Sequence, residues 1–235
     1  RSRGLGDVYK RQKVAFKETI RKKSDVEYKY KKQSGGHGQY GHVKMTFEPS
    51  GDMDTPYVFE QTVVGGAVPK NFFPAVEKGI AESVKKGPLA AYPVTGIKAV
   101  LYDGSYHPVD SSEMAFKVAT QQAFKKGIME AKPVLLEPIA TLKVVVPEGY
   151  TGDVMGELNK RRARVMGMNP TDNGYQEIVA DIPYLELYGY NATLRSMTSG
   201  SGTFSYEFAR YEQAPDDVAA KQIEERASKL VEVEE

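Results

Sequence analysis

Residues 33–43 read QSGGHGQYGHV, and residues 102–116 read YDGSYHPVDSSEMAF. The three histidines of the chain, His37, His42 and His107, all lie in these two stretches, and four glycines occur between Gly35 and Gly41. Glycine lets the backbone adopt positive φ and approach a partner closely. The two stretches are therefore predicted to form the tips of two loops that contact another molecule.

The charge distribution suggests what that molecule is. Ten basic residues between Lys10 and Lys32 lead into the first stretch, against three acidic ones. Through Pro133 the chain has 22 Lys+Arg and 14 Asp+Glu, whereas from Val134 onward it has 10 and 17, within a net charge of +1. A positive first half indicates a polyanionic partner, and a basic arm with a hydrogen-bonding tip suits folded RNA. A chance split of charge is the alternative.

Composition is that of a soluble globular protein with room for two domains: 235 residues, 40% hydrophobic and 27% charged. The chain has no cysteine, which excludes disulfides and thiolate sites and fits a reducing cytoplasm. No apolar run approaches the roughly 20 residues of a membrane span. Residues 1–12 lack the apolar core of a secretory signal. They are expected to be a disordered tail or an artefact of cloning or assembly.

The first half predicts a mixed α/β domain over residues 13–133. Strands are expected at residues 14–20, 26–30, 42–47, 57–64 and 94–102 from period-two alternation. One helix is expected from Pro69 to Gly87. A second begins at Asp110–Glu113, capped by Asp110 or Ser111, and ends at Gly127 as the C′ glycine.

The second half, residues 134–235, alternates more cleanly. Strands are expected at residues 139–146, 175–182 and 204–211, and helices at residues 151–166, within 183–197, and at 215–231. This order predicts an α+β chain whose second domain is ferredoxin-like, βαββαβ. Its remaining strand is expected near Tyr175–Ile178 or near Leu136.

Five segments together resemble a known family. QSGGHGQYGHV, SYHPVDSSEMAFKVA, AKPVLLEPI, TGDVMGELNKRRARVMGM and LRSMTSGSGTFSYEFARYE are similar, in order and spacing, to the last two domains of bacterial elongation factor G. The resemblance covers about residues 13–226. It implies an elongated fourth domain with a left-handed βαβ crossover, followed by a ferredoxin-like fifth domain.

The resemblance also implies a function. The fourth-domain tip of this family enters the decoding region of the small ribosomal subunit, mimics a tRNA anticodon arm and promotes movement of tRNA–mRNA. The fifth domain leans on large-subunit rRNA. The residues that match the RNA-contacting tip are Ser34, Gly35, Gly36, His37, Gln39, Tyr106, His107, Pro108 and Asp110.

Gln39 and His107 are expected to touch the codon–anticodon duplex. An imidazole can donate to a phosphate or a 2′-OH, and an amide can read a minor-groove edge. The alternative for each is a solvated loop residue. Two positions depart from the family pattern: His37 stands where Arg is expected and Pro108 where Asp is expected. Elongation-factor-G-like paralogues and ribosome-protection proteins alter the same tips.

Metal binding, triad catalysis and nucleotide binding are less favoured than RNA contact. His37 and His42 lack a third ligand nearby, so no metal is expected. Asp110, Ser111 and Ser112 beside His107 resemble a catalytic triad, but a helix cap explains the serines. TSGSG, residues 198–202, fits no nucleotide motif and is interpreted as a loop near rRNA. A basic cluster in the acidic half is either a solvated helix face or a phosphate contact: Lys160, Arg161, Arg162 and Arg164.

No P-loop occurs in the chain, so it resembles a fragment without the GTPase domain. No enzymatic activity and no cofactor are expected of it, because GTP and Mg²⁺ belong to that domain. A cytoplasmic monomer that binds the ribosome and no membrane is expected. Two alternatives remain: a ribosome-protection or ribosome-recycling factor of the same architecture, and a stand-alone enzyme related to small-molecule kinases that share the crossover.

Overall fold

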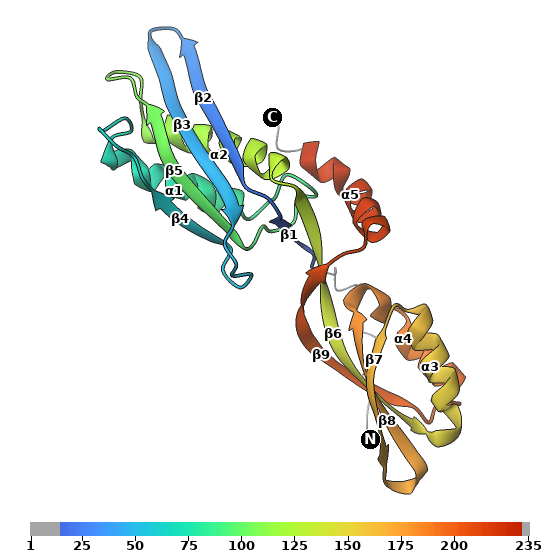
Figure 1. The fold of residues 1–235 in the computed structure, drawn as a ribbon. Coiled ribbons are helices and arrows are strands. Elements are labelled where there is room, and N and C mark those ends of the chain that lie inside the picture. The colour runs from blue at the N-terminus through green and yellow to red at the C-terminus, as the bar shows by residue number, and fades with distance from the viewer. Residues whose placement is uncertain (1–14, 232–235) are drawn as a thin grey trace, which may run out of the picture. The chain divides into compact units, whose positions relative to one another are not determined.

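The computed structural model describes residues 15–231 (Figure 1). The expectation for residues 1–12, and the start of the first strand at Val14, lie outside this range. The described chain is a mixed α/β protein with two compact units. One unit contains residues 16–136 and 213–231, and the other contains Ala15 and residues 137–212.

The first unit therefore includes the end of the chain as well as its first half. The sequence-based division between Pro133 and Val134 assigned the last helix to the second domain. In the structure this helix, α5 (Asp216–Val231), belongs to the first unit. Its Arg226 donates from Nε to the carbonyl oxygen of Ala90 and from a terminal nitrogen to that of Ala91, both at 2.7 Å.

A four-stranded sheet in the order β2-β3-β5-β4 forms the frame of the first unit. β2–β3 and β3–β5 are antiparallel, while β4 and β5 are parallel neighbours connected through α1. β1 pairs with the first four residues of β6. The elements of the unit are β1 (Lys17–Ile20), β2 (Ser24–Ser34), β3 (His37–Pro49), β4 (Tyr57–Gln61), the 3-10 helix η1 (Lys70–Phe72), α1 (Phe73–Ser83), β5 (Ile97–Ser105), α2 (Glu113–Glu130) and the start of β6 (Pro133–Pro147).

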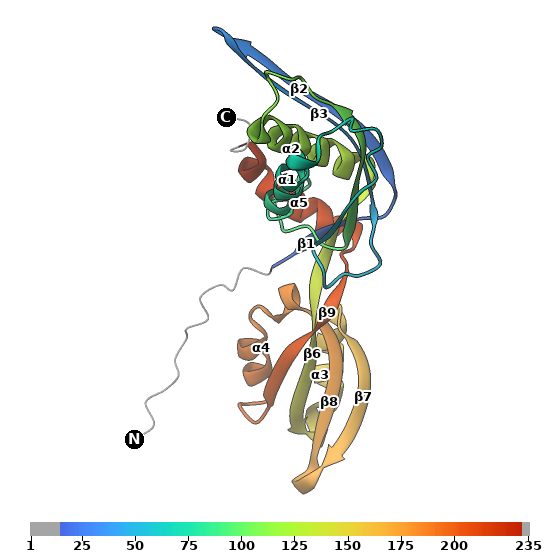
Figure 2. The same cartoon turned by 90° about the vertical axis from the view of Figure 1, so that its left-hand side faces the viewer.

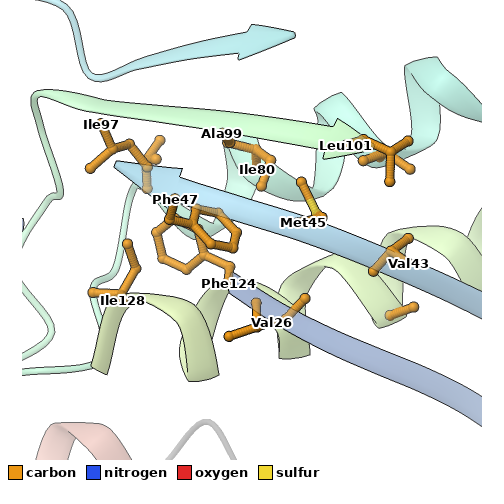
Figure 3. Close-up of a cluster of buried hydrophobic side chains, with 14 of the residues drawn as sticks. Val26, Val43, Met45, Phe47, Ile80, Ile97, Ala99, Leu101, Phe124 and Ile128 are labelled. Atoms are coloured by element: carbon orange, nitrogen blue, oxygen red, sulfur yellow. The ribbon is translucent and has the colours of Figure 1, made fainter. Parts of the chain in front are cut away.

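One face of this sheet is apolar, and α1 and α2 cover it (Figure 2). Alternate residues of β3 and β5 point into the layer between sheet and helices, as the period of two requires. Phe47 meets Phe124 edge to face at a ring separation of 5.7 Å. Figure 3 shows the core made by Val26, Val43, Met45, Phe47, Ile80, Ile97, Ala99, Leu101, Phe124 and Ile128.

Two sequence-based expectations for α2 were wrong. Gly127 is not a C′ glycine but lies inside the helix, where a Cβ would meet the Phe47 ring. The N-cap is Ser112, whose hydroxyl accepts from the amide of Ala115 at 3.1 Å. The need for glycine at residue 127 depends on packing between α2 and the sheet, which a local pattern does not report.

The second unit has the order βαββαβ and the strand order β7-β8-β6-β9, which is the predicted ferredoxin-like arrangement. α3 and α4 pack on one face of its sheet through Val154, Leu158, Tyr190 and Leu194. Its elements after β6 are the 3-10 helix η2 (Glu148–Tyr150), α3 (Thr151–Lys160), β7 (Arg164–Thr171), η3 (Asp172–Gly174), β8 (Tyr175–Pro183), η4 (Tyr184–Leu187), α4 (Tyr190–Met197) and β9 (Thr203–Gln213).

The missing strand of this domain was assigned wrongly. The strand is β7, which begins at Arg164 inside the segment expected to be helix up to Met166, while Tyr175–Ile178 and Leu136 belong to other strands. α3 ends at Lys160 because Arg162 takes φ +56°. Its guanidinium forms a two-pronged ion pair with Glu137, at 2.9 and 3.1 Å. The contact spans 25 residues and fixes the turn into β7.

Candidate nucleic-acid interface

The first predicted tip is the end of the β2–β3 hairpin, which projects beyond the helices of its unit (Figure 2). Ser34 pairs with His37, so Gly35 and Gly36 form a two-residue turn. Their φ angles are +56° and +99°. Positive φ at both central residues matches the twist of a hairpin and favours glycine.

The second predicted tip follows β5 and is a turn folded around its own histidine. Nδ1 of His107 accepts hydrogen bonds from the amides of Val109 at 3.2 Å and Asp110 at 3.0 Å. The amide of His107 donates to Oγ of Ser111 at 2.8 Å, and its carbonyl accepts from the Ser111 amide at 3.1 Å. Because Nδ1 is an acceptor here, the ring proton belongs on Nε2.

The structure brings the two tips together through Tyr40 of β3. The Tyr40 amide donates to the carbonyl oxygen of Asp110, and the Ser111 hydroxyl donates to the carbonyl oxygen of Tyr40, both at 2.9 Å. The Tyr40 ring lies 6.3 Å from the His107 ring, centre to centre. Two stretches about seventy residues apart in sequence thus form one surface.

Close packing explains two of the glycines that the sequence suggested were flexible. A Cβ on Gly38 would lie 2.6–2.9 Å from the carboxylate atoms of Asp110. A Cβ on Gly41 would lie 2.5 Å from the carbonyl oxygen of Ala115, at the start of α2. Gly35 and Gly36 serve the turn, while Gly38 and Gly41 allow the second loop and α2 to approach β3.

A partly buried chain of polar side chains supports Tyr40. Its hydroxyl lies 2.6 Å from Oγ of Ser105, which lies 2.6 Å from Nδ1 of His42. Nε2 of His42 lies 2.6 Å from Oε1 of Glu27, and this hydrogen bond lowers the pKa of Glu27. A consistent assignment has Tyr40 donating to Ser105, Ser105 to His42, and His42 to Glu27. His42 is therefore a structural residue.

The other predicted tip residues are at the surface. His37, Gln39 and Pro108 are exposed, and the side chains of His107 and Asp110 are 49% and 30% exposed. Sequence reasoning missed the apolar part of this surface, Val109 and Met114, which are 78% and 56% exposed beside Tyr106 at 47%. Three exposed lysines lie on the hairpin arm: Lys29, Lys31 and Lys32.

Gln39 and His107 approach the tip from different sides. Consecutive residues of a strand point to opposite faces, so the side chain of Gln39 leaves β3 on the face opposite to Tyr40. The His107 ring lies beside Tyr40. A bound duplex would therefore contact both residues only by covering the edge or end of the hairpin.

The basic cluster of the second unit is divided by its contacts. Arg161 is 15% exposed and donates to the carbonyl oxygens of Glu186 at 2.6 Å and Tyr188 at 3.0 Å. Arg162 is held by Glu137, and this hydrogen bond raises the pKa of Arg162. Lys160 is exposed, and Arg164 is 64% exposed although it contacts Asp181 at 3.1 Å. Lys160 and Arg164 are the most exposed of the four.

The TSGSG loop follows α4 and is built around a buried threonine. Oγ1 of Thr198 donates to the carbonyl oxygen of Leu194 at 2.7 Å and accepts from the Gly202 amide at 2.9 Å. Ser199 and Gly200 take positive φ, +50° and +82°. A hollow of about 560 Å³ lies beside the loop and is lined by Asn191, Arg195, Gly200, Gly202, Thr203, Phe204, Ser205 and Tyr206.

In the part of the chain that the structure describes, the side chains do not form a metal site or a catalytic triad. Among residues 15–231, no three His, Asp or Glu side chains group as metal ligands would. The triad-like serines are engaged otherwise, Ser111 with Tyr40 and Ser112 as the cap of α2. No helix within the described range is long and apolar enough to span a bilayer.

Comparisons with known proteins agree with this architecture. Residues 12–132 match the family model for elongation factor G, domain IV, and residues 134–222 match that for the elongation factor G C-terminus. A Thermotoga maritima protein named elongation factor G-like protein is 50% identical over 222 residues, 94% of this chain and 32% of the relative. A crystal structure of a Thermus thermophilus protein is 44% identical with a TM-score of 0.79, covering 92% of this chain and 32% of that one.

The fold and the paired tips define a two-unit module, an α/β unit with a projecting hairpin and a ferredoxin-like unit, of the kind found in translational GTPases. The chain belongs to the elongation factor G family and corresponds to domain IV and the C-terminal domain. It spans about a third of the length of the relatives that it matches.

Proposed function

We propose that this chain is the ribosome-binding part of a translational GTPase, and that its tip contacts tRNA–mRNA in the decoding region of the small subunit. One observation carries the proposal. The two loops that match the family tip meet at one end of the first unit, joined through Tyr40, Asp110 and Ser111. A projecting, internally bonded tip can enter a narrow RNA site without first having to order itself.

The exposed side chains of the tip suit RNA. His107 presents an N–H donor, Gln39 presents both donors and an acceptor, and Tyr106 offers a ring for stacking on a base or ribose. Lys29, Lys31 and Lys32 on the hairpin arm supply charge for phosphate contacts. The tip would act mechanically, by occupying the position from which tRNA–mRNA has moved.

We propose a separate role for the second unit, contact with large-subunit rRNA. Lys160 and Arg164 are the most exposed members of the basic cluster and the candidates for this contact, although Arg164 also contacts Asp181. The TSGSG loop, with Arg195 beside it, is the other candidate surface. A phosphate contact of this kind positions a protein without reading sequence.

In this proposal, GTP and Mg²⁺ bind to a different part of the longer protein, and the residues present here perform no catalysis. The protein works in the cytoplasm as a monomer. The alternative is a ribosome-protection or ribosome-recycling factor of the same architecture. It is favoured by His37 and Pro108, which replace the residues expected at two tip positions.

Binding to purified small ribosomal subunits over a range of salt concentrations tests the proposal. If the chain neutralises about four to six phosphates, the logarithm of its affinity falls linearly with the logarithm of salt concentration, with a slope of about −0.9 per contact on duplex. A salt-independent affinity, or no binding at low salt, contradicts the proposal. Stoichiometric GTP binding by the chain in calorimetry would contradict the assignment of GTP to another part of the protein.

A further inference from the structure

We propose that Gly38 and Asp110 act as a pair of positioning residues, through which the first tip loop fixes the imidazole of His107 in the second. The pair would hold His107 as a single tautomer, with its proton on Nε2. Only the consequence for RNA binding rests on the proposed function.

The His107 ring is held by the backbone of its own turn. Two backbone amides, those of Val109 and Asp110, point at Nδ1 from 3.2 and 3.0 Å. A nitrogen that accepts two N–H groups carries no proton, so Nε2 carries it. The ring therefore offers its ligand a donor, and the ligand atom that it suits is an acceptor such as a phosphate oxygen, a 2′-hydroxyl oxygen or a base carbonyl.

Asp110 contacts both loops at once. Its amide is one of the two donors to Nδ1, and its carbonyl oxygen accepts from the Tyr40 amide of β3 at 2.9 Å. Its carboxylate oxygen Oδ2 lies 3.5 Å from Nδ1 of His107. A displacement of Asp110 would therefore move a donor away from the ring.

Gly38 makes room for Asp110. A methyl group there would lie 2.6 Å from Oδ2, 2.7 Å from Cγ and 2.9 Å from Oδ1 of Asp110. Its backbone does not require glycine, because positive φ occurs at Gly35 and Gly36 but not at Gly38. All three distances are shorter than real Cβ contacts, so the Asp110 carboxylate must move in Gly38→Ala.

Side-chain ¹⁵N NMR of the full 235-residue chain tests the coupling. In the wild type, His107 should show a pyridine-type Nδ1 and a pyrrole-type Nε2. In Gly38→Ala, this pattern should be lost and replaced by the averaged pattern of an unconstrained histidine. In the double variant Gly38→Ala/Asp110→Ala, the space vacated by the carboxylate accommodates the new methyl group, so the wild-type pattern should return.

Controls separate coupling from general disruption. Gly156→Ala, where a Cβ meets nothing within 4 Å, should leave the His107 signals unchanged. The His42 signals should stay unchanged in every variant, because this ring is held by Ser105 and Glu27. A proton on Nδ1 in the wild type, a Gly38→Ala spectrum like the wild type, or a double variant without recovery would each overturn the inference.

Binding to small ribosomal subunits, measured on the same variants, gives the separate test of function. Affinity should fall about tenfold in Gly38→Ala and stay unchanged in Gly156→Ala. If the NMR pattern follows the prediction while affinity stays constant, the coupling stands and the proposed contact of His107 with RNA is wrong.

Discussion

The guanidinium of Arg226 lies over the ring of Tyr92, 3.7 Å from its centroid, and joins the last helix of the chain to the segment before β5. The same guanidinium donates to the carbonyl oxygens of Ala90 and Ala91. Ala91 takes φ +57°, so this segment needs partners to hold it. Residues 135 positions apart thus complete one unit.

Replacement of Arg226 by alanine should destabilise the first unit. The change removes two charge-assisted hydrogen bonds and a cation–π contact, for an expected loss of about 2–4 kcal/mol. Chemical denaturation measures it. Lys221→Ala is the control on the same helix, because Lys221 is 74% exposed and lies 4.0 Å from Glu225, and it should change stability by less than about 0.5 kcal/mol. Equal effects of the two changes would contradict the role given to Arg226.

Glu18 is expected to stabilise the same segment from its other side. Its buried carboxylate accepts from the amides of Leu89, Ala90 and Tyr92 at 2.8–3.0 Å. Glu18→Ala would leave three amides without this acceptor and should cost about 3 kcal/mol or more. Thermal or chemical unfolding measures the loss. A cost below about 1 kcal/mol would show that water replaces the carboxylate.

The pH dependence of stability should also reveal Glu18. Burial raises its pKa above the ordinary 4.5, against the opposing effect of the hydrogen bonds from Tyr92, Ala90 and Leu89. A carboxyl with a raised folded-state pKa contributes most to stability below its unfolded pKa, and this contribution is lost as pH rises through the folded pKa. The unfolding free energy of the wild type relative to Glu18→Gln should therefore decrease as pH rises from below 4.5. An increase over that range would mean that the folded-state pKa is lowered.

Two helical glycines should respond oppositely to the same substitution. Gly127→Ala in α2 places a methyl against the Phe47 ring, with Cε2 2.7 Å away, and should destabilise by about 1–3 kcal/mol. Gly156→Ala in α3 meets nothing within 4 Å and should stabilise by about 0.5–1 kcal/mol through helix propensity. Denaturation of both variants is the measurement. A stabilising Gly127→Ala would mean that the sheet–helix spacing is looser than described.

The lysines of the hairpin arm should control the salt dependence of RNA binding. Lys29→Ala and Lys31→Ala should each make the slope of log affinity against log salt less steep by about 0.7–0.9. Lys98→Ala serves as the control, because Lys98 pairs with Glu60 at 3.0 Å. Filter binding to small subunits provides the slopes. If Lys29→Ala and Lys31→Ala both keep the wild-type slope, the arm does not contact phosphate.

The sequence was sufficient for most elements, because alternation and periodicity are local signals. It failed where a distant contact decides the local conformation. The apparent period of the α3 segment continued to Met166, but Arg162 turns the chain there by binding Glu137, 25 residues earlier. Gly127 looked like a helix end because the facing ring of Phe47 lies about 80 positions away in sequence.

Local sequence patterns were also insufficient within the candidate site. Glycine density predicted an unusual loop, and the turn at Gly35 and Gly36 agrees with it. The pattern could not distinguish those two from Gly38 and Gly41, whose requirement comes from Asp110 and α2. Nor could it find Val109 and Met114 at the surface, because apolar residues there follow no period that distinguishes them from core residues.

The central claim, that the tip acts on tRNA–mRNA, is tested most directly by His107→Ala in the full-length protein that carries this chain. Gln39→Ala is the second variant, and the pair should be non-additive if one duplex at the edge or end of the hairpin contacts both residues. The measurement is single-turnover movement of tRNA–mRNA on the ribosome, with a melting curve of each variant. We predict that His107→Ala slows movement about tenfold, through loss of about 1–3 kcal/mol of contact, and changes stability by no more than about 0.5 kcal/mol. Movement at the wild-type rate, or a loss of several kcal/mol of stability, would show that His107 is a structural residue and contradict the account.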